Sequence, residues 1–152
     1  GAPEAPITAE LDRAFVERLR GLVARVTANF DAFEYAHALQ ETETFLWRDF
    51  TDTYLELVKV RARGGDAAAG SAVATLRLGL RTLVRMFAPV LPYVTEEVWS
   101  WAFAAETKAP SIHSAPWPAA ADFGPYAGWT GRENNAAGAL QRVYLELDGT
   151  LK

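Results

Sequence analysis

The feature that most constrains the fold is a spacing of apolar residues in steps of three and four along the first part of the chain. These apolar positions are Leu11, Phe15, Leu19, Leu22, Val26 and Phe30. Because such steps return to the same side of a 3.6-residue turn, they place one apolar stripe along one face of a helix. We therefore predict a first helix over this stretch, with Thr8 as the cap at its start.

A second and longer helix is predicted between residues 31 and 64, because neither glycine nor proline interrupts the chain there. Asp31 and Glu34 have the spacing of a capping box, so this helix is expected to begin at Asp31. Its stripe consists of Ala36, Leu39, Glu43, Leu46, Phe50, Tyr54 and Leu57. The charged member, Glu43, indicates that the helix is not wholly buried along this stripe.

Two further helices and their joints complete the predicted fold. Asp66 can cap a third helix, which ends where Pro89 and Pro92 turn the chain. Gly79 within it costs about 1 kcal/mol relative to alanine, and is expected to mark a close helix crossing. A fourth helix is predicted over residues 93–104. Four amphipathic helices with short joints favour an all-α fold, an antiparallel helical bundle with a C-terminal loop-rich wrap.

The chain divides into three predicted units. Residues 1–7 are a tail or remnant, residues 8–118 are the helical bundle, and residues 119–152 are a loop that ends in a short helix or strand packed on the bundle. Apolar residues between Leu140 and Leu147 fit both helical and strand spacing, so both remain open. Trp117 and Trp129 are expected to pin the loop to the helices. Because the chain begins with Gly1 and not methionine, we expect it to be a piece of a longer protein.

Composition excludes several classes of protein and site. Cysteine is absent, so no disulfide or thiolate metal site forms, and with only His37 and His113 no metal site is predicted. No apolar run reaches about 18 residues, so no membrane span is predicted. The net charge of −4 argues against a general polyanion binder and leaves room for a local anion-binding surface. We expect a cytoplasmic protein that binds neither membranes nor DNA.

The sequence predicts no catalytic site and no cofactor of its own. His37 lies in the long helix with no nucleophile assigned to it, and is interpreted as a helix histidine bonded to a neighbour or to water. Ser111 and His113 alternate in a loop with no acid to orient the imidazole ring. Glu96 and Glu97 are explained by favourable negative charge at the start of the fourth helix.

Two groups of basic residues remain, one closing the long helix and one on the third helix. The first group is Lys59, Arg61 and Arg63, and the second is Arg77, Arg81 and Arg85. Cations at a helix C-terminus stabilise its dipole, which by itself accounts for the first group. The second is a solvated face, or pairs with acids of the long helix such as Glu41, Glu43 and Asp49. If both groups met at one end of the bundle, they would form a phosphate-sized positive patch beside aromatic residues.

Three motifs carry a resemblance to a known family. They are FLWRDFTDTYLELVK (residues 45–59), MFAPVLPYVTEEVW (residues 86–99), and Ser111-Ile112-His113 followed by Trp117-Pro118. In this order and at these separations, the trio resembles the anticodon-binding helical domain of class I aminoacyl-tRNA synthetases, most closely that of the valyl-tRNA synthetase family. Thr51 departs from the family, which usually has cysteine there.

The resemblance implies tRNA as a partner and assigns candidate roles to motif residues. Leu55 becomes a candidate packing contact with a base, and Lys59 a candidate contact with a phosphate or base. Trp47 and Tyr54 match the motif but are expected to be buried scaffold residues. The remaining tRNA-binding candidates are Asp52, Arg61 and Arg63, with Arg77, Arg81 and Arg85 as weaker ones. Pro89, Pro92 and Trp99 are expected to be architectural.

The implied function is recognition of a tRNA anticodon, of a valine isoacceptor, while a separate catalytic domain of the parent chain carries out ATP-dependent aminoacylation. That catalytic domain would be a second partner. The family's catalytic signatures, His-x-Gly-His and Lys-Met-Ser-Lys-Ser, do not occur here, so this chain alone is not expected to be an enzyme. Two alternatives remain: a structural bundle that braces a synthetase without contacting RNA, and an independent helical protein-interaction module.

Overall fold

The computed structural model describes residues 4–119 and 121–123. Within these residues the secondary structure is helical and contains no strand, which confirms the predicted all-α class. The helices are α1 (Glu10–Asp31), α2 (Tyr35–Thr44), η1 (Phe45–Leu55), α3 (Glu56–Val58), η2 (Arg61–Arg63), α4 (Ala67–Phe87), α5 (Pro92–Ala102) and η3 (Ile112–Ser114). The backbone stays helical at the junctions from α2 through η1 to α3, so these three segments form one long helix.

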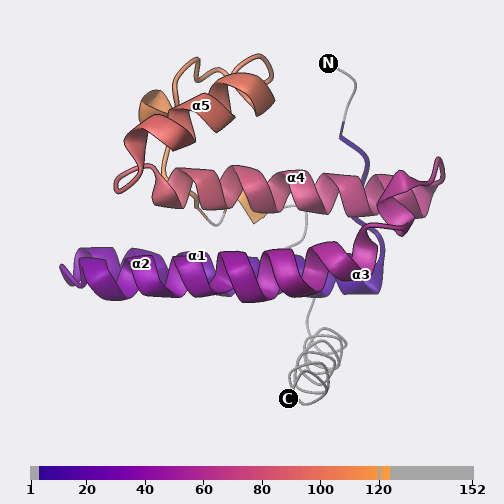
Figure 1. Cartoon of the computed structure of the whole chain (residues 1–152), viewed down its shortest axis with the longest axis horizontal. Coiled ribbons are helices and arrows are strands. Elements are labelled where there is room, and N and C mark those ends of the chain that lie inside the picture. Colours follow the sequence, from indigo (N-terminus) through magenta and orange to yellow (C-terminus); the bar gives the residue numbers. More distant parts are fainter. Residues whose placement is uncertain (1–3, 120, 124–152) are drawn as a thin grey trace.

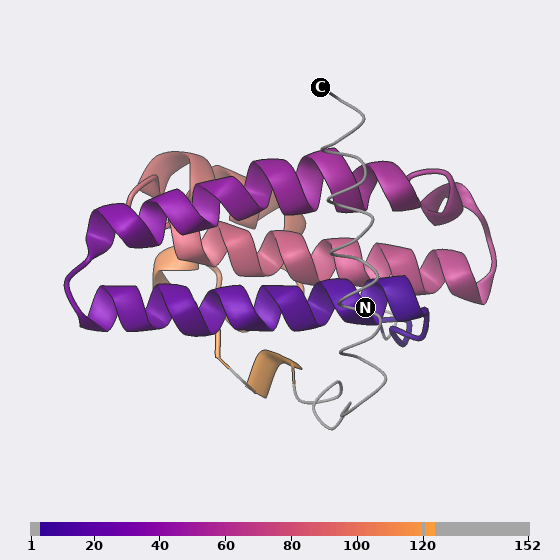
Figure 2. The same ribbon diagram turned by 90° about the horizontal axis from the view of Figure 1, so that it is seen from below.

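Three long helices form the body of the bundle. α1, the long helix and α4 lie side by side, and α5 packs on the second half of α4 (Figure 1, Figure 2). The main core lies between the three long helices, where the ring of Phe15 stacks on that of Tyr54 with centroids 4.2 Å apart. A second core lies between α4, α5 and the following loop, around Trp99 and Phe103. The antiparallel bundle is therefore confirmed.

The start of α1 differs from the prediction. Its N-cap is Ala9, which makes no side-chain cap, so the prediction of Thr8 as the cap is wrong. The backbone N–H groups of Thr8 and Ala9 instead donate to the hydroxyl of Ser71 on α4, at 3.0 and 3.2 Å. Ile7 is buried in the main core, so the predicted tail over residues 1–7 ends before that residue.

The turn between α1 and α2 also differs. Asp31 ends α1 and does not open the next helix, which begins at Tyr35 without a side-chain cap. The N–H of Phe33 donates to the carbonyl of Phe30 and that of Glu34 to the carbonyl of Asn29, at 3.0 and 2.8 Å. These two bonds form a Schellman motif, which satisfies the last carbonyls of α1 and outcompetes the predicted capping box. Phe33 occupies its left-handed position, with φ of 62°.

The long helix ends at Val58 and its middle is a π-helix, η1. Hydrogen bonds in a π-helix join residues five apart, so its turns are wider than those of the predicted α-helix. The hydroxyl of Thr53 follows the same step and donates to the carbonyl of Arg48 at 2.8 Å. Such segments occur frequently at functional sites.

The third helix agrees with the sequence. Asp66 caps α4 by accepting a hydrogen bond from the N–H of Ala69 at 2.8 Å. Gly79 marks a close crossing, because a Cβ atom there would lie 2.7 Å from Cε2 of Phe50 on the long helix.

The loop after α5 is held by the second and third motifs together. Glu96 accepts hydrogen bonds from the hydroxyl of Ser111 and the N–H of Ile112, at 2.9 and 2.8 Å. The indole N–H of Trp99 donates to the carbonyl of Ala109 at 2.9 Å. Glu96 thus clamps a loop, whereas the sequence had indicated only a charge at a helix end. Trp117 pins the loop to α1 through Thr27, whereas Trp129 and the predicted terminal helix or strand lie outside the described residues.

Candidate nucleic-acid interface

The residues of the Tyr-Leu-Glu-x-x-Lys stretch differ sharply in exposure. Tyr54 is fully buried, Leu55 is half-buried, and Asp52 and Lys59 are exposed. Arg63, just beyond the helix end, is exposed as well. One side of the long helix is therefore buried in the core and the other is exposed to solvent, with Leu55 at the border between the two.

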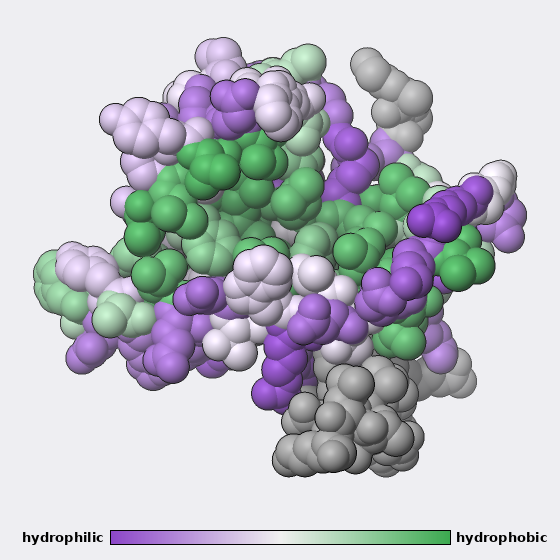
Figure 3. Space-filling model, in the orientation of Figure 1, coloured by the Kyte–Doolittle hydropathy of each residue, from purple (hydrophilic) through white to green (hydrophobic). Residues whose placement is uncertain are grey.

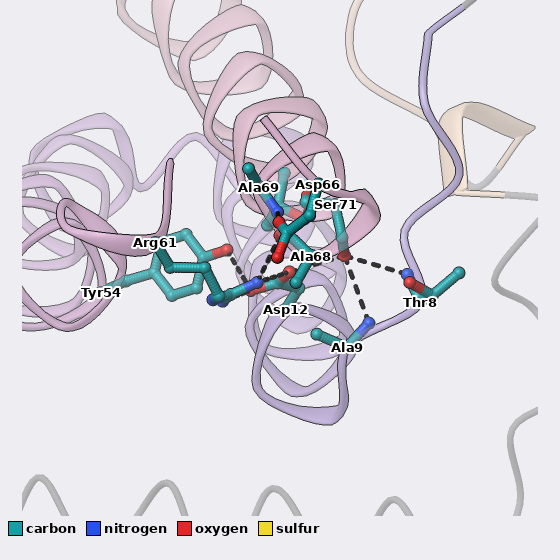
Figure 4. A network of polar contacts seen from close by, with 10 residues as sticks. Thr8, Ala9, Asp12, Tyr54, Arg61, Asp66, Ala68, Ala69 and Ser71 are labelled. Atoms are coloured by element: carbon teal, nitrogen blue, oxygen red, sulfur yellow. Dashed lines mark hydrogen bonds and ion pairs between the residues drawn. The ribbon is translucent and has the colours of Figure 1, made fainter. Parts of the chain in front are cut away.

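A buried polar network fixes the end of the long helix against α1 and α4 (Figure 4). The carboxylate of Asp12 on α1 accepts hydrogen bonds from the Tyr54 hydroxyl at 2.7 Å, from the Ser71 hydroxyl at 2.6 Å, and from Nη1 of Arg61 at 2.8 Å. Arg61 also donates to the carbonyl of Ala68 at 2.9 Å. This network joins α1, the long helix and α4 at the end of the long helix, near the exposed residues Lys59 and Arg63.

The charges in this network stabilise each other. Burial alone would raise the pKa of Asp12, but hydrogen bonds from Arg61, Ser71 and Tyr54 and the charge on Arg61 outweigh it, so the pKa lies below its ordinary value. Burial and the neighbouring carboxylate of Asp12 raise the pKa of Tyr54 far above its ordinary value. Asp12 is thus ionised and Tyr54 neutral at physiological pH.

Two of the three basic residues that close the helix, Arg61 and Lys59, have different roles. Arg61 is committed to Asp12, and its pKa is raised, first by that hydrogen bond. Lys59 forms an exposed ion pair with Glu56, one turn earlier on the same helix. An exposed pair of this kind is worth less than about 1 kcal/mol, so it leaves the Lys59 ammonium group free to exchange Glu56 for an anionic ligand.

Two members of the second basic group, Arg77 and Arg85, are engaged by the loop after α5. Arg85 is 7% exposed and donates to Asp122 and to the carbonyl of Pro116, at 3.0 and 3.2 Å. Burial lowers the pKa of Arg85, in part offset by Asp122. Arg77 pairs with Glu106, and its guanidinium lies 5.6 Å from the centre of the Phe103 ring. Both therefore bind the loop after α5, and the role of this group in RNA binding stays a prediction.

Two acids of the long helix, Glu41 and Asp49, form ion pairs with arginines of α1. Arg25 donates to Glu41 at 2.9 Å, and Arg18 pairs with Asp49. The predicted pairing of these two acids with the arginines of the third helix is therefore wrong. The reason is that Glu41 and Asp49 face the groove between α1 and the long helix, which both arginines line.

Trp47 departs most clearly from its predicted role. Its side chain is 57% exposed, so the prediction that it is a buried scaffold residue is wrong. It lines an apolar groove of about 430 Å³ between the long helix, α4 and α5. Figure 3 shows hydrophobic side chains gathered in a hollow between α5 and the long helix. The other lining residues are Leu39, Glu43, Leu46, Val84, Phe87, Val90, Leu91, Val94, Thr95 and Val98.

The two histidines lie on the surface. Nε2 of His37 is 3.4 Å from Oε1 of Glu41, in agreement with its interpretation as a helix histidine bonded to a neighbour. His113 is exposed, and the hydroxyl of the nearby Ser111 donates its hydrogen bond to Glu96.

Among the described residues, no group of three acidic or histidine side chains is placed to hold a metal ion. Over the same residues, every helix is too short or too polar to cross a membrane.

Sequence reasoning missed two features of this region. Asp12 was not predicted to matter, although an acid four residues before Val16 on the buried face of α1 is an available signal for a buried partner. The exposure of Trp47 has no such signal, because spacing alone does not reveal which side chains the neighbouring helices cover.

The fold and this surface define a helical binding module, built on an anchored helix end that carries an exposed cation. The chain belongs to the family described as "Anticodon-binding domain of tRNA ligase", whose match covers residues 12–145. This family assignment agrees with the resemblance carried by the three motifs.

Relatives of the chain support the same assignment. The chain is 50% identical to the valine–tRNA ligase of Salinispora arenicola over 117 residues, which are 76% of this chain and 13% of the relative. It is 47% identical to the valine–tRNA ligase of Leifsonia xyli over 78% of this chain and 13% of that protein. It is 46% identical to that of Cutibacterium acnes over 79% and 14%. The chain thus spans about one seventh of the length of these relatives.

Proposed function

We propose that this chain recognises the anticodon loop of a valine tRNA, within a synthetase whose separate catalytic domain carries out ATP-dependent aminoacylation in the cytoplasm. The observation that supports this proposal is the exposed Lys59 next to half-buried Leu55, on a helix end that Asp12 and Arg61 hold in place. A rigid helix of this kind can offer an apolar contact to an unpaired base and a cation to the adjacent phosphate.

The proposal assigns a different contact with the RNA to each of several neighbouring residues. Leu55 packs against a loop base, Lys59 and Arg63 contact the backbone or a base edge, and Asp52 lies on the same exposed side as a hydrogen-bond acceptor. Arg61 acts through the network and not by contact. The weak net charge of −4 fits a surface that relies on few, local contacts.

The test is a titration of the chain with valine tRNA at low salt, against the same tRNA with a substituted anticodon. We expect tighter binding of the unaltered tRNA. Lys59→Ala is expected to weaken binding and to reduce the slope of log K against log salt by about 1. Lys108→Ala, which removes an exposed lysine from the loop after α5, is the matched control.

The rival hypothesis is a bundle that braces a synthetase without touching RNA. It predicts equal affinity for both tRNAs and no effect of Lys59→Ala. Arg63→Ala is a better second variant than Arg61→Ala, because loss of Arg61 would leave Asp12 buried without its partner and confound binding with stability.

A further inference from the structure

We propose that Trp47 is a stacking platform for a second unpaired base of the same RNA, seated at the mouth of the apolar groove between the long helix and α5. The proposal rests on the proposed function, because it extends the surface at Leu55 and Lys59 along the same helix. It assigns the groove a ligand chemistry: a nucleobase whose face lies on the indole ring, with its phosphate toward Arg48.

The exposure of Trp47 sets it apart from the other aromatic residues of its segment. Phe45, Phe50 and Tyr54 are all buried in the main core, whereas more than half of the Trp47 side chain faces solvent. A large aromatic face kept in water beside an apolar groove is characteristic of a binding site. Every base has a π-face, so stacking on tryptophan is available to any unpaired nucleotide.

The position of Trp47 is continuous with the proposed interface. Trp47, Thr51, Leu55 and Lys59 follow each other in steps of four, and residues four and five apart share a face of the wide-turned η1 segment. Trp47 and Leu55 are eight residues apart, which is about 12 Å at the rise of an α-helix and less in a π-helix. Stacked nucleotides of one strand advance about 3.4 Å each, so one loop can reach both positions.

The groups around Trp47 are complementary to both parts of a nucleotide, its phosphate and its base. Arg48, the next residue, is exposed and can supply a cation to a phosphate. Glu43 lines the groove one turn earlier, and its carboxylate can accept a hydrogen bond from the exocyclic amino group of a base. Leu91 and Val94 provide the apolar wall opposite. A purely apolar partner segment would leave both charges of this rim without a counterpart.

The first experiment compares Trp47→Ala and Trp47→Phe with Trp101→Ala in titrations with valine tRNA. Trp101 is the matched control, because it is an exposed tryptophan on α5 that does not line the groove. We expect Trp47→Ala to weaken binding about 5- to 150-fold, the range that stacking on one aromatic ring contributes. Trp47→Phe should retain most of the affinity, and Trp101→Ala should bind as the unsubstituted chain does.

The second experiment locates the base. Single abasic nucleotides are placed along the anticodon loop, and each tRNA is titrated against the unsubstituted chain and Trp47→Ala. One abasic position should weaken binding to the unsubstituted chain and have no further effect on Trp47→Ala. Circular dichroism melts verify that all three tryptophan variants fold.

The outcomes separate this inference from the proposed function. If Lys59→Ala weakens binding while Trp47→Ala does not, the stacking platform is refuted and the proposed function stands. The inference is also refuted if Trp47→Ala weakens binding by the same factor for every abasic tRNA, since this would indicate a general effect on the helix. If the unsubstituted chain does not distinguish the anticodons, the proposed function fails and this inference fails with it.

Discussion

Replacing Gly79 by alanine tests the close crossing between α4 and the long helix. An ideal Cβ at this position would lie 2.7 Å from Cε2 of Phe50 and 3.3 Å from Cε1 of Phe15. Ordinary carbon–carbon contacts lie at about 3.5–4.0 Å. The ring of Phe50 is itself packed against that of Phe15, with centroids 5.8 Å apart, so it has little room to withdraw.

Two opposing effects set the magnitude. Alanine in the middle of a helix is favoured over glycine by about 1 kcal/mol. Inserting a methyl group into a packed core costs about 1–3 kcal/mol. Because the approach is to ring carbons of buried side chains, we place the cost in the upper half of that range, and the net effect of Gly79→Ala is a loss of about 1–2 kcal/mol. For a chain of this length that corresponds to a fall in Tm of about 2–8 °C.

Gly21→Ala is the matched control. Gly21 lies in α1, and a Cβ there would meet only the flexible end of Arg25, at 3.4 Å. The same substitution should therefore raise the free energy of unfolding by up to about 1 kcal/mol. Urea unfolding followed by circular dichroism measures both variants, and their effects are expected to have opposite signs.

A double mutant isolates the contact itself. Phe50→Leu removes the ring that Gly79→Ala strikes, so the second substitution should cost less, or even stabilise, in the Phe50→Leu background. If Gly79→Ala stabilises the chain as much as Gly21→Ala does, or if its effect is the same in both backgrounds, the account of the crossing is incorrect.

Three further predictions concern the polar contacts and the α1–α2 turn. Because the native pKa of Asp12 is lowered, its stabilisation is present above the unfolded pKa of about 3.9 and is lost as the pH falls through the native pKa. Asp12→Asn should thus cost about 3 kcal/mol at pH 7, and urea melts at decreasing pH should show this difference shrinking. Phe33→Gly should stabilise by up to about 1 kcal/mol, since glycine adopts the left-handed conformation without strain; a lower urea midpoint would contradict this. Glu96→Gln should weaken the loop clamp by about 1 kcal/mol and speed amide exchange at Ile112, whereas Glu97→Gln, on the exposed side of α5, should not.

Most of the helical architecture was determined by local sequence. Asp66 caps α4 as predicted, because an N-cap carboxylate bonds to an N–H three residues on and needs no distant partner. The prolines after Phe87 marked a helix end for a similarly local reason, whereas Gly79 marked a crossing because only glycine leaves room for Phe50 of the long helix. The family motifs in turn predicted an anticodon-binding domain, and the family match agrees.

The starts of the first two helices depended on competing hydrogen bonds. At α1, the hydroxyl of Ser71 on α4 accepts hydrogen bonds from the N–H groups of Thr8 and Ala9. Asp31 and Glu34 have the spacing of a capping box, yet the chain uses that stretch to close α1 with a Schellman motif. The wide turns of η1 were likewise invisible in the apolar spacing. Periodicity specifies that a helix exists more firmly than it specifies the hydrogen bonds inside it.

The amino-acid sequence by itself determined that four amphipathic segments must pack together, because each has a stripe of apolar side chains that is stabilised by burial away from water. Tertiary structure alone decided which polar side chains remain available for binding. From the sequence, Arg61 and Arg85 were expected to be surface cations, but the fold placed Asp12 and Asp122 beside them. Trp47 was expected to be buried, but the fold left more than half of its side chain in solvent. The charge and hydrophobicity of a side chain follow from its residue type. Whether that side chain is available to a ligand depends on which other side chains the fold packs against it.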